Sequence, residues 1–109
     1  MKLVPKYIKN WGSRLESKLK GYLGIAQKAG YVVYGGDELK GYTKKLFVIL
    51  HSETASQNLK DLLDKAAERL QIPNLEVKNL TELLSKDSCK AVGIKNNGIA
   101  QEIIKIVKG

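Results

Sequence analysis

The stretch LGIAQKAGYVVYGGDELK, residues 23–40, combines the end of a helix, a strand and the start of a second helix. Gly30 follows an apolar helical stripe and predicts the end of that helix. The next four residues, YVVY, are typical of a strand. Gly35 and Gly36 then predict a tight turn into a helix that begins with two acids, Asp37 and Glu38. Backbone amides and carboxylates exposed at such a corner can meet phosphate or the edge of a base.

Upstream of this corner, apolar residues recur at helical spacing and predict a long helix. Ser13 followed by Glu16 is typical of a capping box, so we expect the helix to begin near residue 13. The residues expected on its buried face are Leu15, Leu19, Leu23 and Ala26. Residues 1–12 are basic, and we expect them to form a tail or a loosely helical start.

Downstream of the corner, strand and helix patterns alternate to the end of the chain. LFVIL at residues 46–50 predicts a strand covered on both faces. Thr54 with Gln57 predicts the start of a helix that closes before Pro73. The remaining patterns predict a short strand at 75–77, a short helix at 80–85, a strand at 91–94 and a last helix after residue 98. In that last helix, the residues expected to face inward are Ile99, Ile103 and Ile106.

The alternation of helices and strands indicates an α/β fold. With about four strands, the expected architecture is a three-layer α/β/α sandwich. Its mixed sheet of about four strands would carry helices on both faces. A chain of 109 residues has room for one domain of this kind, which we place at residues 13–109.

The positive charge of the chain is concentrated in its first part. The net charge is +8, from 19 basic and 11 acidic residues. Residues 1–45 hold ten of the basic residues and three of the acidic ones. A local excess of this kind indicates a surface that meets an anionic partner, although basic N-terminal arms are often only solvated.

Several chemistries are excluded by the counts of reactive residues. Cys89 is the one cysteine and His51 the one histidine, so neither a disulfide framework nor a cluster of Cys and His ligands can form within one chain. We expect Cys89 to be a core thiol, and we expect no metal, no cofactor and no catalysis. No apolar run approaches the ~20 residues of a membrane helix, so we expect a cytoplasmic protein without a membrane partner.

Four segments, taken in order, resemble the kink-turn RNA-binding ribosomal-protein family, the large-subunit "seven-Ae/thirty-e" type. The resemblance is greatest to its small bacterial ribosomal-protein-like members. The segments are LGIAQKAG, the GGDE corner, LFVILHSETASQNLKDLLDKAAE and KAVGIKNNGIAQEI. No single segment is highly specific, but the ordered set spans roughly residues 20–107.

The resemblance implies a domain that docks on a sharply kinked RNA duplex with sheared G·A pairs. In the family pattern G-x-N-E-x-x-K, Glu38 falls on the Glu, which could accept hydrogen bonds from guanine. Asp37 falls where Asn is usual, and Gly41 falls where Lys is usual, with Lys40 the nearest lysine. A later apolar loop of the family corresponds to residues 83–85, which would pack against an extruded base. Charge and resemblance together predict an RNA-binding set of Lys28, Gly35, Gly36, Asp37, Glu38, Lys40, Lys44, Lys45, Leu83, Leu84 and Ser85.

These observations favour a non-enzymatic, ribosome-associated RNA-binding protein that acts as a monomer. Its expected partner is structured RNA, ribosomal RNA or the ribosome included. The alternative is a protein–protein interaction module on the same fold, with a protein partner and little RNA specificity. A third and poorer reading is an accessory domain of an RNA-modifying methyltransferase, because the chain has no room for a cofactor-binding catalytic domain.

Overall fold

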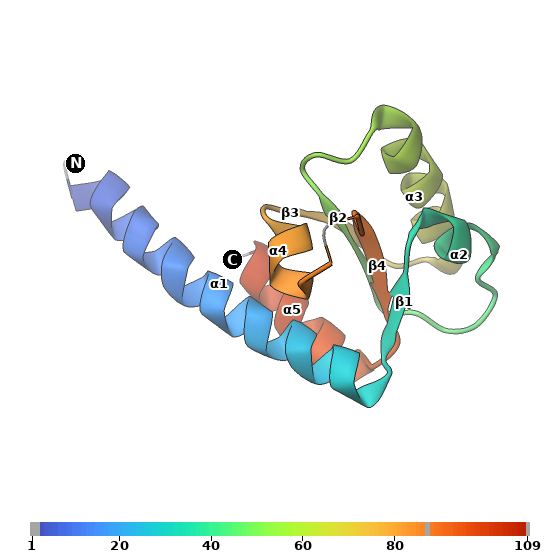
Figure 1. Ribbon diagram of the computed structural model, residues 1–109, viewed down its shortest axis with the longest axis horizontal. Helices are drawn as coiled ribbons and strands as arrows, with labels where there is room; N and C mark the ends of the chain where they lie inside the picture. Colours follow the sequence, from blue (N-terminus) through green and yellow to red (C-terminus); the bar gives the residue numbers. More distant parts are fainter. Residues whose placement is uncertain (1–2, 87, 109) are drawn as a thin grey trace.

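Helices and strands alternate through residues 3–86 and 88–108, which the computed structural model describes, with side chains from Leu15 onward (Figure 1). The elements of this described part are α1 (Leu3–Ala29), β1 (Val32–Tyr34), α2 (Gly36–Gly41), β2 (Val48–Ser52), α3 (Gln57–Leu70), β3 (Asn74–Val77), α4 (Leu80–Leu84), β4 (Ala91–Ile94) and α5 (Asn97–Lys108). No helix among these residues is long and apolar enough to cross a membrane.

The four strands form one mixed sheet in the order β1-β4-β2-β3. Strands β2 and β3 run parallel, with Leu50 beside Leu75. Strand β4 runs antiparallel to both of its neighbours, β1 and β2. The last strand in the sequence therefore lies inside the sheet, where it joins the corner that follows β1 to the rest of the domain.

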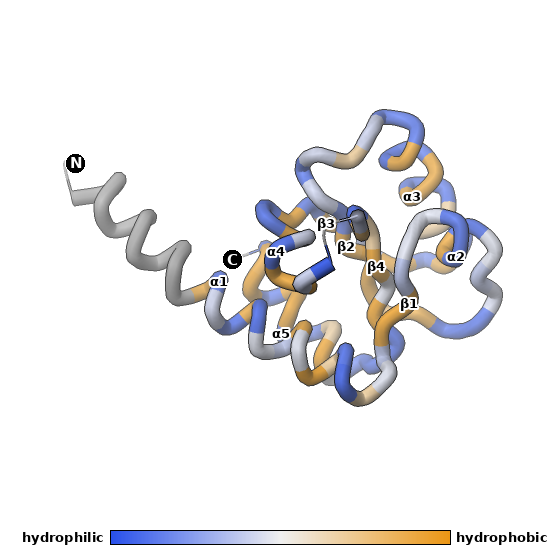
Figure 2. Tube along the Cα trace, viewed as in Figure 1, coloured by the Kyte–Doolittle hydropathy of each residue, from blue (hydrophilic) through white to orange (hydrophobic). Residues whose placement is uncertain are grey.

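Helices α1, α4 and α5 cover one face of the sheet. Leu23 of α1, Leu80 of α4 and Ile103 of α5 are fully buried there against strand residues such as Val92. Ile99 and Ile106 are partly buried against the same cluster, which confirms the inward face expected for the last helix. Figure 2 shows hydrophobic residues along the strands and on the inner side of these helices.

Helices α2 and α3 cover the opposite face, which completes the expected three-layer α/β/α sandwich (Figure 1). Leu39 of α2 and Leu63 of α3 are fully buried against Ile49 of β2. Both faces of the sheet are thus apolar, as the uninterrupted LFVIL run predicts.

Helix α1 is longer than expected at its N-terminal end. It begins at Leu3, not near Ser13, and runs without a break to Ala29. Pro5 lies in its first turn, where a proline has no intrahelical hydrogen bond to lose. The capping-box pattern at residue 13 is therefore part of a continuous helix. Most of the expected tail is helical backbone, while residues 1 and 2 and the side chains of residues 3–14 lie outside the described part.

Two other boundaries differ from expectation, one because of strand pairing and one because of a side-chain cap. Strand β2 begins at Val48, where pairing with β4 starts, and Leu46 packs outside the ladder. Helix α3 is capped by Ser56, whose hydroxyl accepts from the Leu59 amide at 3.2 Å. Thr54, the expected start of this helix, lies in the preceding turn, where its amide donates to the Ser52 hydroxyl.

Gly93 in strand β4 lets helix α2 approach the sheet. A Cβ at this position would lie 2.8 Å from Leu39 Cδ2 and 2.9 Å from Leu46 Cδ1. Both leucines are buried, so neither has room to move aside. The close packing of α2, the helix that follows the Gly35–Glu38 corner, therefore requires glycine at position 93.

We predict that Gly93→Ala lowers the free energy of unfolding by about 1–3 kcal/mol, because one added carbon overpacks this contact. Gly21→Ala is the matched control, since a Cβ at this exposed helical position meets nothing within 4 Å. The control is expected to raise stability by about 0.5–1 kcal/mol. Urea unfolding followed by circular dichroism measures both variants, and wild-type stability for Gly93→Ala would contradict the packing argument.

Candidate nucleic-acid interface

The corner after strand β1 depends on an unusual backbone conformation at Gly35. Its φ of 88° and ψ of 152° lie in a region that is essentially restricted to glycine. The Gly35 amide donates to the Ala91 carbonyl at 2.9 Å, and its carbonyl accepts from the Leu39 amide at 3.1 Å. The residue thus belongs to the sheet on one side and to helix α2 on the other.

The next position, Gly36, favours glycine for a different reason, namely the packing of α2 against α3. A Cβ there would lie 2.6 Å from Leu59 Cδ1, so a side chain would displace this half-buried leucine or push α2 away from α3. The first glycine of the pair therefore permits the turn, and the second permits the packing of the helix that follows. Two separate physical requirements, one of backbone conformation and one of packing, therefore explain the two adjacent glycines in the sequence.

Asp37 and Glu38 lie exposed in the first turn of α2. No side chain caps this helix, because its N-cap is Gly35. Carboxylates in the first turn interact favourably with the free amides and the positive end of the helix dipole. Among the described residues neither acid forms an ion pair, and the end of the helix stabilises both carboxylates at the surface.

Asp37 and Glu38 share an open pocket of about 340 Å³ with two lysines. Lys44 reaches it from the loop between α2 and β2, and Lys95 reaches it from the residue after β4. The other lining residues are Gly41, Tyr42 and Thr43. Hydrogen-bond acceptors and ammonium donors from three separate segments therefore line one surface hollow.

Lys95 was not among the expected RNA-binding residues. It enters the site through strand pairing, since its amide donates to the Tyr31 carbonyl at 2.7 Å. Lys95 could be predicted as a site residue only by pairing β1 with β4. These two strands are far apart in the sequence, so the local pattern does not reveal their pairing.

Lys40 lies apart from this pocket. It lines a groove between α2 and α3, together with residues that include Lys65 and Arg69. The Arg69 guanidinium donates to the carbonyls of Tyr42 at 2.7 Å and of Lys40 at 3.1 Å. Arg69 thereby satisfies carbonyls at the C-terminal end of α2 and holds the short helix in place.

Lys28 and Lys45 are exposed and also lie outside the pocket of Asp37 and Glu38, which we call the acidic pocket. Lys28 is in the last turn of α1, and Lys45 is in the loop that precedes β2. The structure thus brings Asp37, Glu38 and Lys44 together and places the other three predicted lysines outside their pocket.

The expected contact of residues 83–85 with an extruded base needs correction. Leu83 and Leu84 are 7% and 2% exposed, because α4 turns both side chains into the core beneath α1 and α5. Ser85 is exposed, in a left-handed conformation that ends α4. The two leucines are therefore core residues, and only Ser85 remains at the surface.

Lys86 is the residue of this loop that approaches the corner. Its ammonium group lies 4.9 Å from the centre of the Tyr34 ring, which is a favourable cation–π distance. Tyr34 directly precedes Gly35, so Lys86 lies at the same end of the sheet as the corner, on the face covered by α4. The C-terminal end of α4 is held against α1 because the side-chain amide of Gln27 donates to the Leu84 carbonyl at 3.1 Å.

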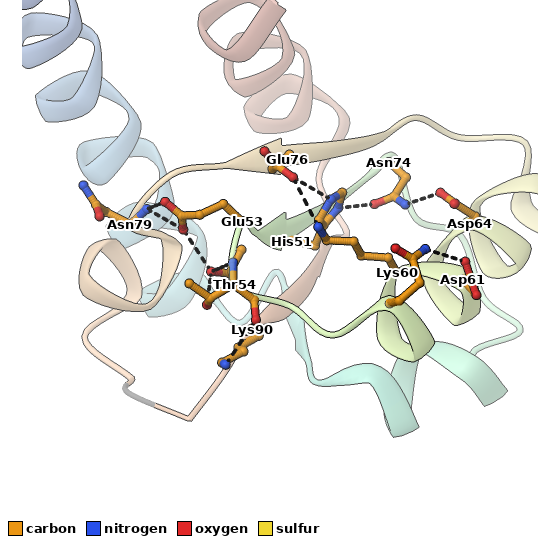
Figure 3. Close-up of polar contacts among 12 residues, drawn as sticks. His51, Glu53, Thr54, Lys60, Asp61, Asp64, Asn74, Glu76, Asn79 and Lys90 are labelled. Atoms are coloured by element: carbon orange, nitrogen blue, oxygen red, sulfur yellow. Dashed lines mark hydrogen bonds and ion pairs between the residues drawn. The ribbon is translucent and has the colours of Figure 1, made fainter.

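A second polar network, shown in Figure 3, surrounds His51. The histidine is 8% exposed, and its Nδ1 lies 2.8 Å from the side-chain oxygen of Asn74. The side-chain amide nitrogen of Asn74 in turn donates to the Asp64 carboxylate at 2.7 Å, and a Glu76 carboxylate oxygen lies 3.9 Å from His51 Nε2. These contacts tie β2, β3 and α3 together, and no group of three or more metal-binding side chains is found among the described residues.

Comparisons with known proteins bear on the fold. The sequence matches no protein family and no curated protein. The structure is similar to a solved structure of a Bacillus halodurans protein described as having unknown function. The TM-score is 0.76 at 21% identity, over 84% of this chain and 98% of that chain. At this identity the likeness shows a shared α/β fold, and a fold alone does not define a function.

We predict that Gly35→Ala destabilises the corner by about 1–3 kcal/mol, because alanine is strained at this φ and ψ. A loss of this size lowers the melting temperature by at least about 4 °C in a domain of this length. Gly41→Ala is the control at the other end of α2, where a Cβ meets nothing within 4 Å. Scanning calorimetry compares the two, and equal melting temperatures would contradict the role given to Gly35.

Proposed function

We propose that this protein binds sharply kinked, structured RNA through the pocket beside the corner, as kink-turn-binding ribosomal proteins do. It acts without catalysis, in the cytoplasm, on ribosomal RNA or the ribosome. The observation that carries the proposal is the meeting of Asp37, Glu38, Lys44 and Lys95 in one open pocket. The sequence resemblance supports the same function independently of this geometry.

The pocket offers the hydrogen-bonding groups that a guanine edge requires. An ionised Glu38 accepts, and the amino and imino groups of guanine donate. The ammonium groups of Lys44 and Lys95 donate, and guanine O6, guanine N7 or a phosphate oxygen accepts. A duplex buries the guanine amino and imino groups in base pairs, whereas sheared G·A pairs at a kink leave more of that edge accessible. The pocket is thus suited to kinked RNA.

The lysines outside the pocket supply affinity that does not depend on sequence. Lys40 is exposed on α2 and Lys45 on the loop after it, within a chain whose net charge is +8. Each lysine that contacts a phosphate releases a counterion, so binding weakens as salt rises. This charge positions the RNA, and the pocket selects among RNAs.

The cytoplasmic location is supported by the chemistry of Cys89. This residue has a free thiol, which donates to the Ala91 carbonyl at 3.3 Å. A half-buried free thiol is typical of proteins in a reducing compartment.

We predict that Glu38→Ala weakens binding to a short kink-turn RNA by about 1–3 kcal/mol, because it removes acceptors for guanine. Glu68→Ala is the matched control, since Glu68 is an exposed carboxylate on α3 outside the pocket. Fluorescence anisotropy at fixed salt measures both affinities. Equal affinities of the two variants would remove the pocket from RNA recognition and favour a protein-interaction module.

We predict that Asp37→Asn tightens binding to the same RNA about fivefold. The exchange restores a donor beside the acceptor and removes one negative charge near phosphate, which is worth about 1 kcal/mol in water. The same anisotropy titration, repeated at two salt concentrations, tests this. Weaker binding by the Asn variant would show that the Asp37 carboxylate itself makes a required contact.

A further inference from the structure

Two large hydrophobic side chains are exposed within residues 15–86 and 88–108, and they lie at one place in the fold. Ile25 is 56% exposed in the last turns of α1, and Tyr31 is 38% exposed just before β1. Figure 1 shows the end of α1, the start of β1 and the start of α5 meeting there, at the lower edge of the molecule. This end of the sheet is opposite to the one at which β1 leads into the corner.

The backbone of Tyr31 is held on both sides. Its amide donates to the Ala26 carbonyl at 2.8 Å, and its carbonyl accepts from the Lys95 amide at 2.7 Å. Gly30, with a φ of 77°, makes the turn that permits the first of these bonds. An exposed aromatic side chain on a fixed backbone loses little conformational freedom when a partner stacks on it.

Two exposed lysines belong to the same part of the fold as this tyrosine. Lys28 lies three residues before it in the last turn of α1, one helical turn after Ile25. Lys95 is hydrogen-bonded to it through the backbone, and the Lys95 side chain lines the pocket of Asp37 and Glu38. Within the described part of the chain, neither lysine forms an ion pair with a carboxylate. Their positive charge is therefore available to an anionic partner.

We propose that Tyr31, together with Lys28 and Lys95, is a stacking site for an unpaired nucleotide of the bound RNA. The base stacks on the tyrosine ring, and the phosphates on either side of it contact the two lysines. Lys95 belongs to both sites, so one RNA strand can run from the acidic pocket to Tyr31. The inference rests on the proposed RNA-binding function and adds a single-stranded segment to the recognised RNA.

The observations favour a nucleotide over a protein partner at this surface. A stable protein interface covers about 800 Å² on each side and has an apolar centre. Two exposed apolar side chains with lysines beside them are a small surface for such a partner. A single base requires one aromatic face and positive charge for its phosphates, and both are present here.

The test compares three RNAs. One is a blunt-ended kink-turn RNA, and the other two are the same RNA with a single-stranded tail of three uridines at the 5′ end or at the 3′ end. The wild-type protein is expected to bind one of the tailed RNAs more tightly, by roughly five- to 150-fold for a stacked base. Tyr31→Ala should abolish this gain and leave the affinity for the blunt RNA unchanged. Tyr31→Phe should retain the gain, because stacking needs the ring and not the hydroxyl group.

The role of Lys28 is tested by the salt dependence of the same titrations. Lys28→Ala should reduce the slope of log affinity against log salt by about one for the tailed RNA and not for the blunt RNA. Lys78→Ala, which removes an exposed lysine from the turn after β3, is the control and should change neither slope.

Two results would overturn the stacking site. One is equal wild-type affinity for tailed and blunt RNA, and the other is a Tyr31→Ala variant that weakens both RNAs alike. Either result would leave the kink recognition by the acidic pocket intact. Failure of the proposed function is a different observation, namely that blunt kink-turn RNA is bound no better than a plain duplex.

Discussion

The turn at Gly35 is the constraint on which the rest of the candidate site depends. Its backbone conformation is essentially open to glycine alone, and its hydrogen bond to Ala91 fixes it to the central part of the sheet. From this point α2 runs back across the sheet, in contact with α3 at Gly36 and with β4 at Gly93. Arg69 then holds the far end of α2 through its carbonyls. A helix of six residues is thus positioned at both ends by contacts outside itself.

In the proposed RNA complex, different charged groups near α2 provide the affinity for phosphate and the selectivity for base edges. The acids of α2 and the lysines of the pocket lie within one surface hollow, where they provide both acceptors and donors. The excess of positive charge lies in the first 45 residues of the sequence. Lys40 and Lys45 of this part are exposed outside the hollow, on α2 and on the loop between α2 and β2. A surface with basic residues alone would bind any phosphate backbone. Two carboxylates beside the lysines weaken that general attraction, and they favour a partner whose base edges can donate to them.

Much of the fold could be predicted from the sequence, because the buried faces of helices and strands place apolar residues at regular spacing. The stripes ending at Ala26 and passing through Ile103, and the apolar run before His51, correctly indicated helices on both faces of a mixed sheet. Element boundaries set by single contacts could not be read in this way, and the capping pattern at Ser13 is an example. In the site, local chemistry identified the glycine corner and its acids. Lys95 depends on long-range strand pairing, and the burial of Leu83 and Leu84 depends on which side of a short helix meets the core.

Affinity for kinked RNA relative to straight RNA is the measurement that tests the central claim most directly. A short kink-turn RNA and a plain duplex of equal length are titrated with the wild-type protein at near-physiological salt. A pocket that reads guanine edges predicts a preference of about 100-fold or more for the kinked RNA, equivalent to about 2.7 kcal/mol. Equal and weak binding to the two RNAs would contradict the account. It would show that the basic surface acts alone and that the corner serves another partner.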